Sequence, residues 1–241
     1  MKDLPDWTRQ VVIRYEGGFV GLEELAARLG SIAPWDLKGN IVLMEDFETE
    51  LTEWSDDSDG LGSTATRVSE HKYSGGYSVK LTIGSGAAWY AMLGHPFHYP
   101  GMSKYGAFAR FCIDSTCRTI GLEVALGTGT KWYYPWWRYD RLNKTLKVLT
   151  TGNVYQNIDT VLIMPGTVYL WHPVLITFNL NTGYYDKLYF GSKEYNIASI
   201  PLYSLTSTAA PGGYIAPEAL REDSGVFSAY VDDIILVKNV P

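Results

Sequence analysis

The chain has 241 residues with a formal net charge of −6, and 46% of its residues are hydrophobic. This is enough apolar material for one large domain and argues against a disordered chain. The negative net charge offers no basic stripe that could bind phosphate groups. No run approaches the ~18 apolar residues of a membrane span, and the first residues lack the apolar stretch of a signal peptide. We therefore expect neither a nucleic-acid nor a membrane partner.

The composition favours β-structure. The chain contains 18 Tyr, 8 Trp and 24 Gly, while only 19% of its residues are charged, and such a mixture suits twisted strands and tight turns. Its only two cysteines, Cys112 and Cys117, have a spacing that matches no metal or redox motif. They can bridge a hairpin loop, but we favour two small cysteines that are buried or lie in a loop.

Residues 1–40 differ from the rest and predict an N-terminal arm. After a strand-like segment at 11–15, the segment 21–30 predicts a short helix that ends at Gly30, because four apolar residues share one helical face: Leu22, Leu25, Ala26 and Leu29. A helix of this length is marginal alone. We therefore expect it to dock on the main body or on a neighbouring subunit.

From residue 41 onward, the sequence alternates strand-like segments with turn signals. The predicted strands are 41–47, 78–83, 87–93, 107–113, 120–126, 132–139, 145–149, 174–180, 184–190 and 226–237. The clearest pair, 174–180 and 184–190, is joined by a short polar turn, and a second turn at 192–193 extends it into a meander. About ten strands in one domain, 41–241, indicate two packed sheets.

Segment 132–139 is the most aromatic part of the chain. Side chains alternate along a strand, so one face carries Trp132, Tyr134, Trp136 and Arg138, and the other carries Tyr133, Pro135, Trp137 and Tyr139. If the core takes one face, the other must meet solvent, a ligand or another subunit. Proline lacks a donor for the sheet, so Pro135 indicates an edge strand or a bulge.

Three further segments resemble the first, second and last strands of carbohydrate-binding-module jelly rolls. They are Met44 to Glu48 followed by Trp54, Tyr73 to Leu81, and Val231 to Leu236. The hairpin that begins at Trp171 is similar to strands of concanavalin A-like and laminin-G-like sandwiches. The resemblance implies an all-β fold, a two-sheet jelly-roll β-sandwich, but such sandwiches serve lectins, lyases, glucanases and capsid proteins alike.

The segment from Leu25 to Ser31, running into 39–42 and on to Glu48, is also similar to uncharacterised proteins encoded by phages and prophages. That similarity implies a virion component of decoration or tail type. In such a protein the sandwich would face outward, and the N-terminal arm would hold it to the particle.

Asp46, Glu48 and Glu50 alternate, so in an extended strand their carboxylates would share one face. Retaining glycosidases need two carboxyl groups only ~5 Å apart, and neighbouring same-face positions lie near that range. The order of these acids differs, however, from the Glu-x-Asp-x-x-Glu pattern that glucanases of this fold lead us to expect. A catalytic pair is therefore an alternative here, and no catalytic residue is assigned.

The same resemblance implies a structural Ca²⁺ between the first and last strands, with Glu48, Asp232 and Asp233 in the matching places. The last strand is expected to turn Asp233 toward its apolar face, where an unpaired carboxylate is costly. Carboxylate and carbonyl oxygens suit Ca²⁺. A Lys or Arg partner, or backbone donors, would neutralise the carboxylate as well.

These patterns together predict a non-catalytic structural or adhesive protein, found in a virion or outside cells. Its expected partners are other copies of itself or other virion proteins, bound through the arm, and polysaccharide. One alternative is a free glycan-binding module that uses Trp132, Tyr134, Trp136, Trp137, Arg138 and Tyr139. The other is a polysaccharide-degrading enzyme that uses Asp46, Glu48 or Glu50.

Overall fold

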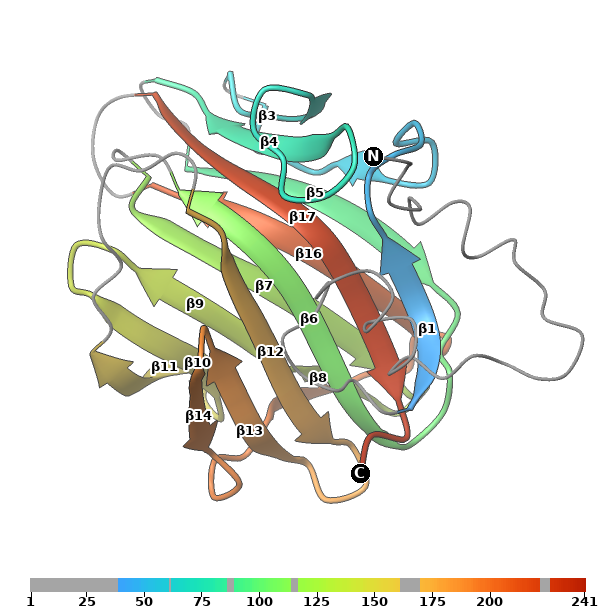
Figure 1. Ribbon diagram of the computed structural model, residues 1–241. Helices are drawn as coiled ribbons and strands as arrows, with labels where there is room; N and C mark the ends of the chain where they lie inside the picture. The colour runs from blue at the N-terminus through green and yellow to red at the C-terminus, as the bar shows by residue number, and fades with distance from the viewer. Residues whose placement is uncertain (1–38, 61, 86–88, 114–116, 161–169, 222–225) are drawn as a thin grey trace, which may run out of the picture.

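The computed structural model describes residues 39–60, 62–85, 89–113, 117–160, 170–221 and 226–241. All the regular elements within these residues are strands (Figure 1). They are β1 (Asn40–Glu45), β2 (Ser55–Asp56), β3 (Thr64–Val68), β4 (Ser78–Ile83), β5 (Tyr90–Phe97), β6 (Lys104–Ile113), β7 (Thr119–Gly127), β8 (Lys131–Tyr134), β9 (Trp136–Asp140), β10 (Thr145–Thr150), β11 (Val154–Thr160), β12 (His172–Asn179), β13 (Tyr184–Phe190), β14 (Lys193–Asn196), β15 (Tyr203–Thr206), β16 (Gly212–Leu220) and β17 (Phe227–Lys238).

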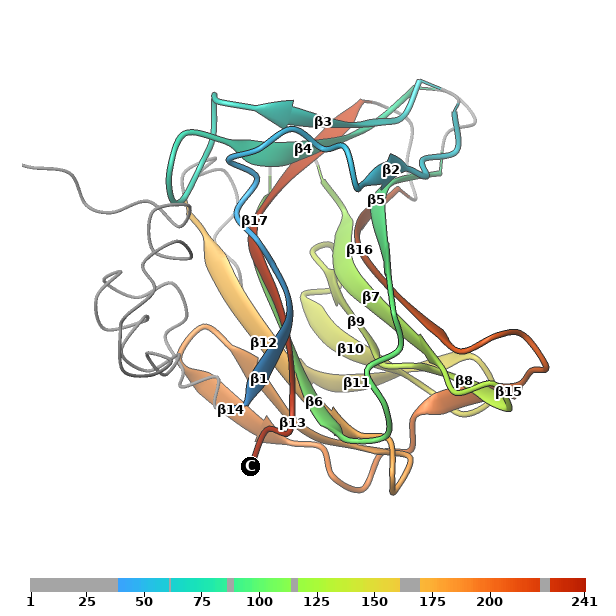
Figure 2. The same ribbon diagram turned by 90° about the vertical axis from the view of Figure 1, so that its right-hand side faces the viewer.

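The strands form two antiparallel sheets that pack face to face (Figure 2). The eight-stranded sheet has the order β14-β13-β12-β6-β17-β4-β3, and β1 pairs with the last part of β17. The nine-stranded sheet has the order β11-β10-β9-β7-β16-β5-β2, with β8 between β7 and β15. The predicted all-β sandwich is confirmed.

The core lies between the sheets and is filled by inward-facing alternate residues. On β12 these are Val174, Ile176 and Phe178, as the sequence pattern predicts, and β13 returns Leu188 and Phe190 to the same layer. From the opposite sheet, the ring of Trp137 packs 5.5 Å from that of Phe111. This layer holds the two sheets together and fixes which residues point outward.

Four strands of the nine-stranded sheet, β2, β11, β15 and β16, are absent from the sequence-based prediction, as is β3 of the other sheet. The omission of β16 matters most, because it is a central strand between β7 and β5. Its Gly212-Gly213 start and its internal Pro217 are typical of loops. The strand nevertheless keeps an unbroken register with β7. Its pairing with β5 is interrupted between Ile215 and Glu218, where Pro217 has no N–H to donate.

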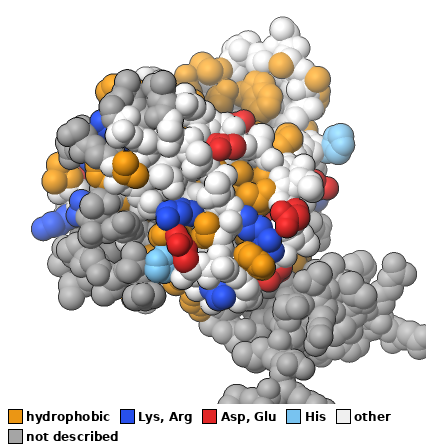
Figure 3. Space-filling model, turned by 90° about the horizontal axis from the view of Figure 1, so that it is seen from above, with side chains coloured by type: hydrophobic (Ala, Val, Ile, Leu, Met, Phe, Trp, Pro, Cys, Tyr) orange, Lys and Arg blue, Asp and Glu red, His pale blue; other side chains and the backbone are white. Residues whose placement is uncertain are grey.

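The arm and helix predicted for residues 1–40 lie outside the described residues, apart from Gly39 and Asn40. The described residues contain no helix that could cross a membrane. Cys112 and Cys117 are both buried, in agreement with the favoured interpretation, and the Cys117 thiol lies 3.7 Å from the Thr119 carbonyl oxygen. On the face seen in Figure 3, acidic and basic side chains lie next to one another among the described residues.

Candidate functional site

The aromatic segment forms one line of chain, β8 followed by β9, that keeps a single register with β7 across Pro135. The alternation of its side chains follows the sequence pattern. Trp137 and Tyr139 face the core and are each 1% exposed, so the ligand-binding role predicted for these two is wrong. The opposite, outer face carries the other four predicted residues, Trp132, Tyr134, Trp136 and Arg138.

The break at Pro135 is bridged by a residue of the other sheet. The hydroxyl of Tyr185, on β13, accepts a hydrogen bond from the backbone N–H of Trp136 at 3.1 Å and donates to the carbonyl of Leu149 at 2.7 Å. The Tyr185 hydroxyl, which reaches across the core, thereby satisfies the backbone N–H of the residue that follows Pro135. This bond fixes the backbone from which the Trp136 ring projects.

Trp136 and Arg138 are held by a buried acid on β16. Glu218 is 3% exposed and accepts hydrogen bonds from Trp136 Nε1 at 2.7 Å, Arg138 Nε at 2.6 Å and an Arg138 terminal nitrogen at 3.1 Å. The guanidinium lies 4.2 Å from the centre of the Trp136 ring and 4.5 Å from that of Tyr155. Burial raises the pKa of Glu218, against the opposing effect of Arg138.

Space for this pair comes from a glycine. Gly121, on β7, lies opposite both Arg138 and Glu218 in the sheet. A Cβ at this position would lie 2.8 Å from Glu218 Oε1 and 2.9 Å from Arg138 Cγ. Only glycine lets the ion pair lie flat on the sheet, so the position serves the arrangement of the outer face.

Next to this pair stands Glu123, also on β7, opposite Trp136 on one side and Ala216 on the other. Within the described residues its carboxylate receives no hydrogen bond. Burial, and then the charge of Glu218, raise the pKa of Glu123 to about 7, against the opposing effect of Arg138. An acceptor without a donor on an outer face is available for an external donor.

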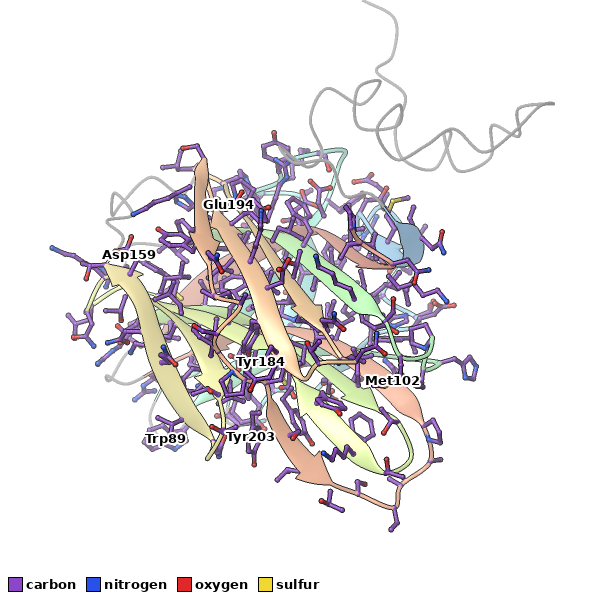
Figure 4. The ribbon with its side chains drawn as sticks, turned by 90° about the horizontal axis from the view of Figure 1, so that it is seen from below. Trp89, Met102, Asp159, Tyr184, Glu194 and Tyr203 are labelled. Atoms are coloured by element: carbon purple, nitrogen blue, oxygen red, sulfur yellow. The ribbon has the colours of Figure 1, made fainter. Side chains whose placement is uncertain are left out.

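Three tyrosines surround Glu123: Tyr134, Tyr155 and Tyr214. Burial is the main cause of the raised pKa of each, and the charge of Glu123 adds to the effect. Tyr214 lies opposite Ala125, two residues from Glu123 on the same face of β7, and the Tyr155 ring lies 5.9 Å from that of Trp136, the residue opposite Glu123. The Tyr214 hydroxyl donates to Asp57 at 2.5 Å. On the far side, Tyr203 of β15, labelled in Figure 4, packs 5.5 Å from Tyr134 and extends the aromatic surface.

We call this surface the acidic–aromatic face. It consists of outer-face side chains from six strands of the nine-stranded sheet and from the residue after β2: Asp57, Glu123, Trp132, Tyr134, Trp136, Arg138, Tyr155, Tyr203, Tyr214 and Glu218. Sequence reasoning missed Glu123, although its position as the one acid in an apolar run at 120–126 was a usable signal. It missed Glu218 because β16 itself was not predicted.

The acids proposed for catalysis do not share a strand face. Strand β1 ends at Glu45, and Phe47 has a φ of 59°, a left-handed conformation that ends the alternation. Glu48 Oε1 accepts backbone N–H groups of Gly76 and Tyr77, at 2.7 and 2.9 Å, whereas the exposed Glu50 lies 3.5 Å from Arg67. The expected row of Asp46, Glu48 and Glu50 is therefore wrong.

Two of the three acids proposed for calcium, Asp232 and Asp233, lie on β17 and are 0% exposed. A bulge lies in β17 between Asp232 and Ile235, Asp233 has a φ of 53°, and Asp232 lies opposite Arg110 of β6. Asp232 accepts backbone N–H groups of Tyr73, Ser74 and Asp233 at 2.9, 3.2 and 2.9 Å. Asp233 accepts the Ser74 hydroxyl at 2.8 Å, and its other oxygen lies 3.1 Å from Arg110 Nε.

These residues do not fit a calcium ion as arranged. Protein donors hydrogen-bond to three of the four aspartate oxygens and to one oxygen of Glu48. The Arg110 guanidinium lies 3.1 Å from the fourth, Asp233 Oδ2, and supplies the positive charge. Within the described ranges, no group of three or more His, Cys, Asp or Glu side chains could hold a metal ion. Arg110 and main-chain donors, the alternative to a metal ion, neutralise the aspartates.

No protein-family model matches the sequence, and no curated protein sequence is similar to it. Solved structures share the fold. The "Cellulose induced protein, Cip1" is 11% identical, with a TM-score of 0.54, over 81% of this chain and 96% of that one. A Bacillus licheniformis beta-glucanase is 12% identical, with a TM-score of 0.52, over 84% of this chain and 100% of that one.

A sialidase is 10% identical, with a TM-score of 0.52, over 83% of this chain. The match covers only 19% of the sialidase, so this chain corresponds to a small part of that protein. Identities this low demonstrate shared architecture and leave the activity open. The chain therefore has the jelly-roll β-sandwich fold that also occurs in a beta-glucanase.

Proposed function

We propose that this chain is a non-catalytic adhesive module that binds polysaccharide through the acidic–aromatic face. The observation that carries the proposal is Glu123, an acceptor without a donor among the described residues, standing on an outer sheet face between Trp136 and three tyrosines. Sugar rings pack their apolar C–H faces on aromatic rings, and their hydroxyl groups donate to carboxylates. The face offers both kinds of contact.

The arrangement favours binding over hydrolysis. Glycosidases need two carboxyl groups that flank the bond to be cleaved. Glu218 is buried, and Arg138 and Trp136 engage both of its oxygens, so Glu123 gains no second carboxylate from it. Release of reducing sugar that disappears in Glu123→Gln would contradict the non-catalytic part of the proposal.

Display on a phage particle belongs to the same proposal. Its support is the similarity of the segment from Leu25 to Glu48 to proteins encoded by phages and prophages. In this arrangement the N-terminal segment belongs to the particle side, and the acidic–aromatic face is free for host or capsular polysaccharide. Immunogold labelling of purified particles from cells that carry the gene tests it, and unlabelled particles would contradict it.

Replacing Trp136 by alanine is expected to weaken polysaccharide binding by about thirtyfold, roughly the 2 kcal/mol of a binding hot spot. The ring supplies the flat apolar surface next to Glu123. Affinity electrophoresis through gels that contain β-glucan, xylan or a polyuronate measures the effect. Trp171→Ala is the matched control, since Trp171 is also partly exposed but precedes β12 of the other sheet. Equal retardation of both variants and wild type would contradict the proposal.

Glu123→Gln is expected to stabilise the protein at pH 8 by about 1–3 kcal/mol and to change it little at pH 4. The raised pKa of Glu123 means that the folded state binds more protons than the unfolded state between pH 4.5, the ordinary pKa of a glutamate, and about pH 7. Its contribution is therefore favourable at low pH and is lost as pH rises through that window. Urea unfolding at the two pH values measures it, and an equal change at both would show that Glu123 is not responsible.

A further inference from the structure

A second apolar cluster lies on the outer face of the eight-stranded sheet, away from the main core. It contains Phe108, Leu175, Ile235 and Val237, which are 0%, 4%, 2% and 0% exposed. The register places both Leu175 and Ile235 opposite Phe108, so these side chains stand together on three adjacent strands. We call the four residues the outer apolar strip.

The strip is packed as tightly as a core. A Cβ at Gly106, the outward position before Phe108 on β6, would lie 3.1 Å from Val237 Cγ2 and 3.4 Å from Leu175 Cδ1. Side chains on one sheet face stand roughly perpendicular to the sheet, so they shield one another's flanks and not their ends. Burial to 0–4% therefore requires a layer of other residues above them.

Described residues provide part of this layer. At one end, Arg110 lies 5.6 Å from the Phe108 ring and is capped by the Tyr73 ring at 3.6 Å. Met44, Tyr189 and Val240 pack against the strip.

We propose that residues 1–38 of this chain dock on the outer apolar strip, through the apolar face of the predicted helix at 21–30. The segment ends beside the strip. Strand β1 begins at Asn40, opposite Lys238, and the next residue, Ile41, lies opposite Val237. Gly39 has a φ of 134°, and a Cβ there would lie 2.4 Å from the Lys238 carbonyl oxygen, so glycine is required where the chain enters the sheet.

The dimensions agree with this occupant. From β17 across β6 and β12 to β13, the strip and its border at Tyr189 span three strand spacings, about 14 Å. A ten-residue helix is about 15 Å long, enough to cross all four strands. Its four apolar side chains, Leu22, Leu25, Ala26 and Leu29, fall on one face.

Two neighbouring alanines give a matched test in the full-length chain. Ala26 lies on the apolar face of the predicted helix, and Ala27 lies on the opposite face. Ala26→Asp and Leu25→Asp are expected to lower the urea midpoint, to increase fluorescence of a dye that binds apolar surface, and to remove amide-exchange protection from 21–30. Ala27→Asp is expected to leave all three as in wild type. This test is independent of glycan binding.

Two results would overturn the proposal. The first is that Ala26→Asp and Leu25→Asp behave like wild type, or that Ala27→Asp perturbs the protein as much as they do. The second comes from light scattering of the same variants. A dimer in the wild type that dissociates on Leu25→Asp would assign the strip to a second copy of the chain instead.

Discussion

Replacing Arg110 by methionine is expected to lower the free energy of unfolding by about 3–5 kcal/mol at pH 7, the usual cost of removing one partner of a buried ion pair. The Arg110 side chain is 3% exposed and lies 3.1 Å from Asp233 Oδ2, while Asp232 and Asp233 are fully buried. Methionine keeps most of the stem and removes the charge. Urea unfolding monitored by fluorescence measures the loss.

The loss should depend on pH. Burial raises the pKa of both aspartates above the ordinary value of 3.8, and for Asp232 the neighbouring Asp233 adds to the effect. A folded state with raised carboxyl pKa values binds more protons than the unfolded state, so its stability is highest at low pH and falls as pH rises. Without Arg110 the values should rise further, and the deficit of the variant should shrink from pH 7 to pH 5.

Lys80→Met is the control for this experiment. Lys80 lies 2.8 Å from Glu70, but both side chains are substantially exposed, so the expected cost is about 0–1 kcal/mol. Ca²⁺ is expected to leave the wild-type midpoint unchanged, because protein donors bind three of the aspartate oxygens and the Arg110 charge lies beside the fourth. A deficit as large at pH 5 as at pH 7, or clear stabilisation by Ca²⁺, would contradict this account of the buried acids.

Trp137→Ala is expected to cost about 3–5 kcal/mol of stability, because it leaves a large cavity in the core. The side chain is 1% exposed and packs against Phe111. Trp136→Ala, one residue away, should cost only about 1 kcal/mol, since it removes mainly the hydrogen bond to Glu218. Denaturant midpoints of the two variants measure the difference, and equal losses would contradict the assignment of the two faces.

Much of the fold was predictable because one face of each sheet is buried. The bounds predicted for β4 and β13, 78–83 and 184–190, agree with the structure. In 132–139 alternation holds even across Pro135, because the strand line continues in register beside β7. Hydrophobic alternation decides which side chain faces inward, and this information is local in the sequence.

The parts that failed depend on long-range contacts. Strand β16 contains Gly212, Gly213 and Pro217, which are unfavourable in strands, and is held in place by its neighbours β7 and β5. A shared face for Asp46, Glu48 and Glu50 requires an extended strand, but Phe47 has a left-handed conformation that ends the alternation. Two of the three donors to Asp232, the backbone N–H groups of Tyr73 and Ser74, come from a loop 159 and 158 positions earlier in the chain, so no local pattern shows that this carboxylate is occupied.

The central claim, that the acidic–aromatic face binds polysaccharide, is tested most directly by NMR of the tryptophan indole N–H groups. The chain has 8 Trp, and Trp136 and Trp171 signals are assigned through Trp136→Phe and Trp171→Phe. β-1,4-Linked gluco- and xylo-hexaoses and a uronate hexamer serve as probes. We expect at least one probe to shift the Trp136 signal saturably while the Trp171 signal stays in place. No shift at Trp136 with any probe, or a shift at Trp171 alone, would contradict the claim.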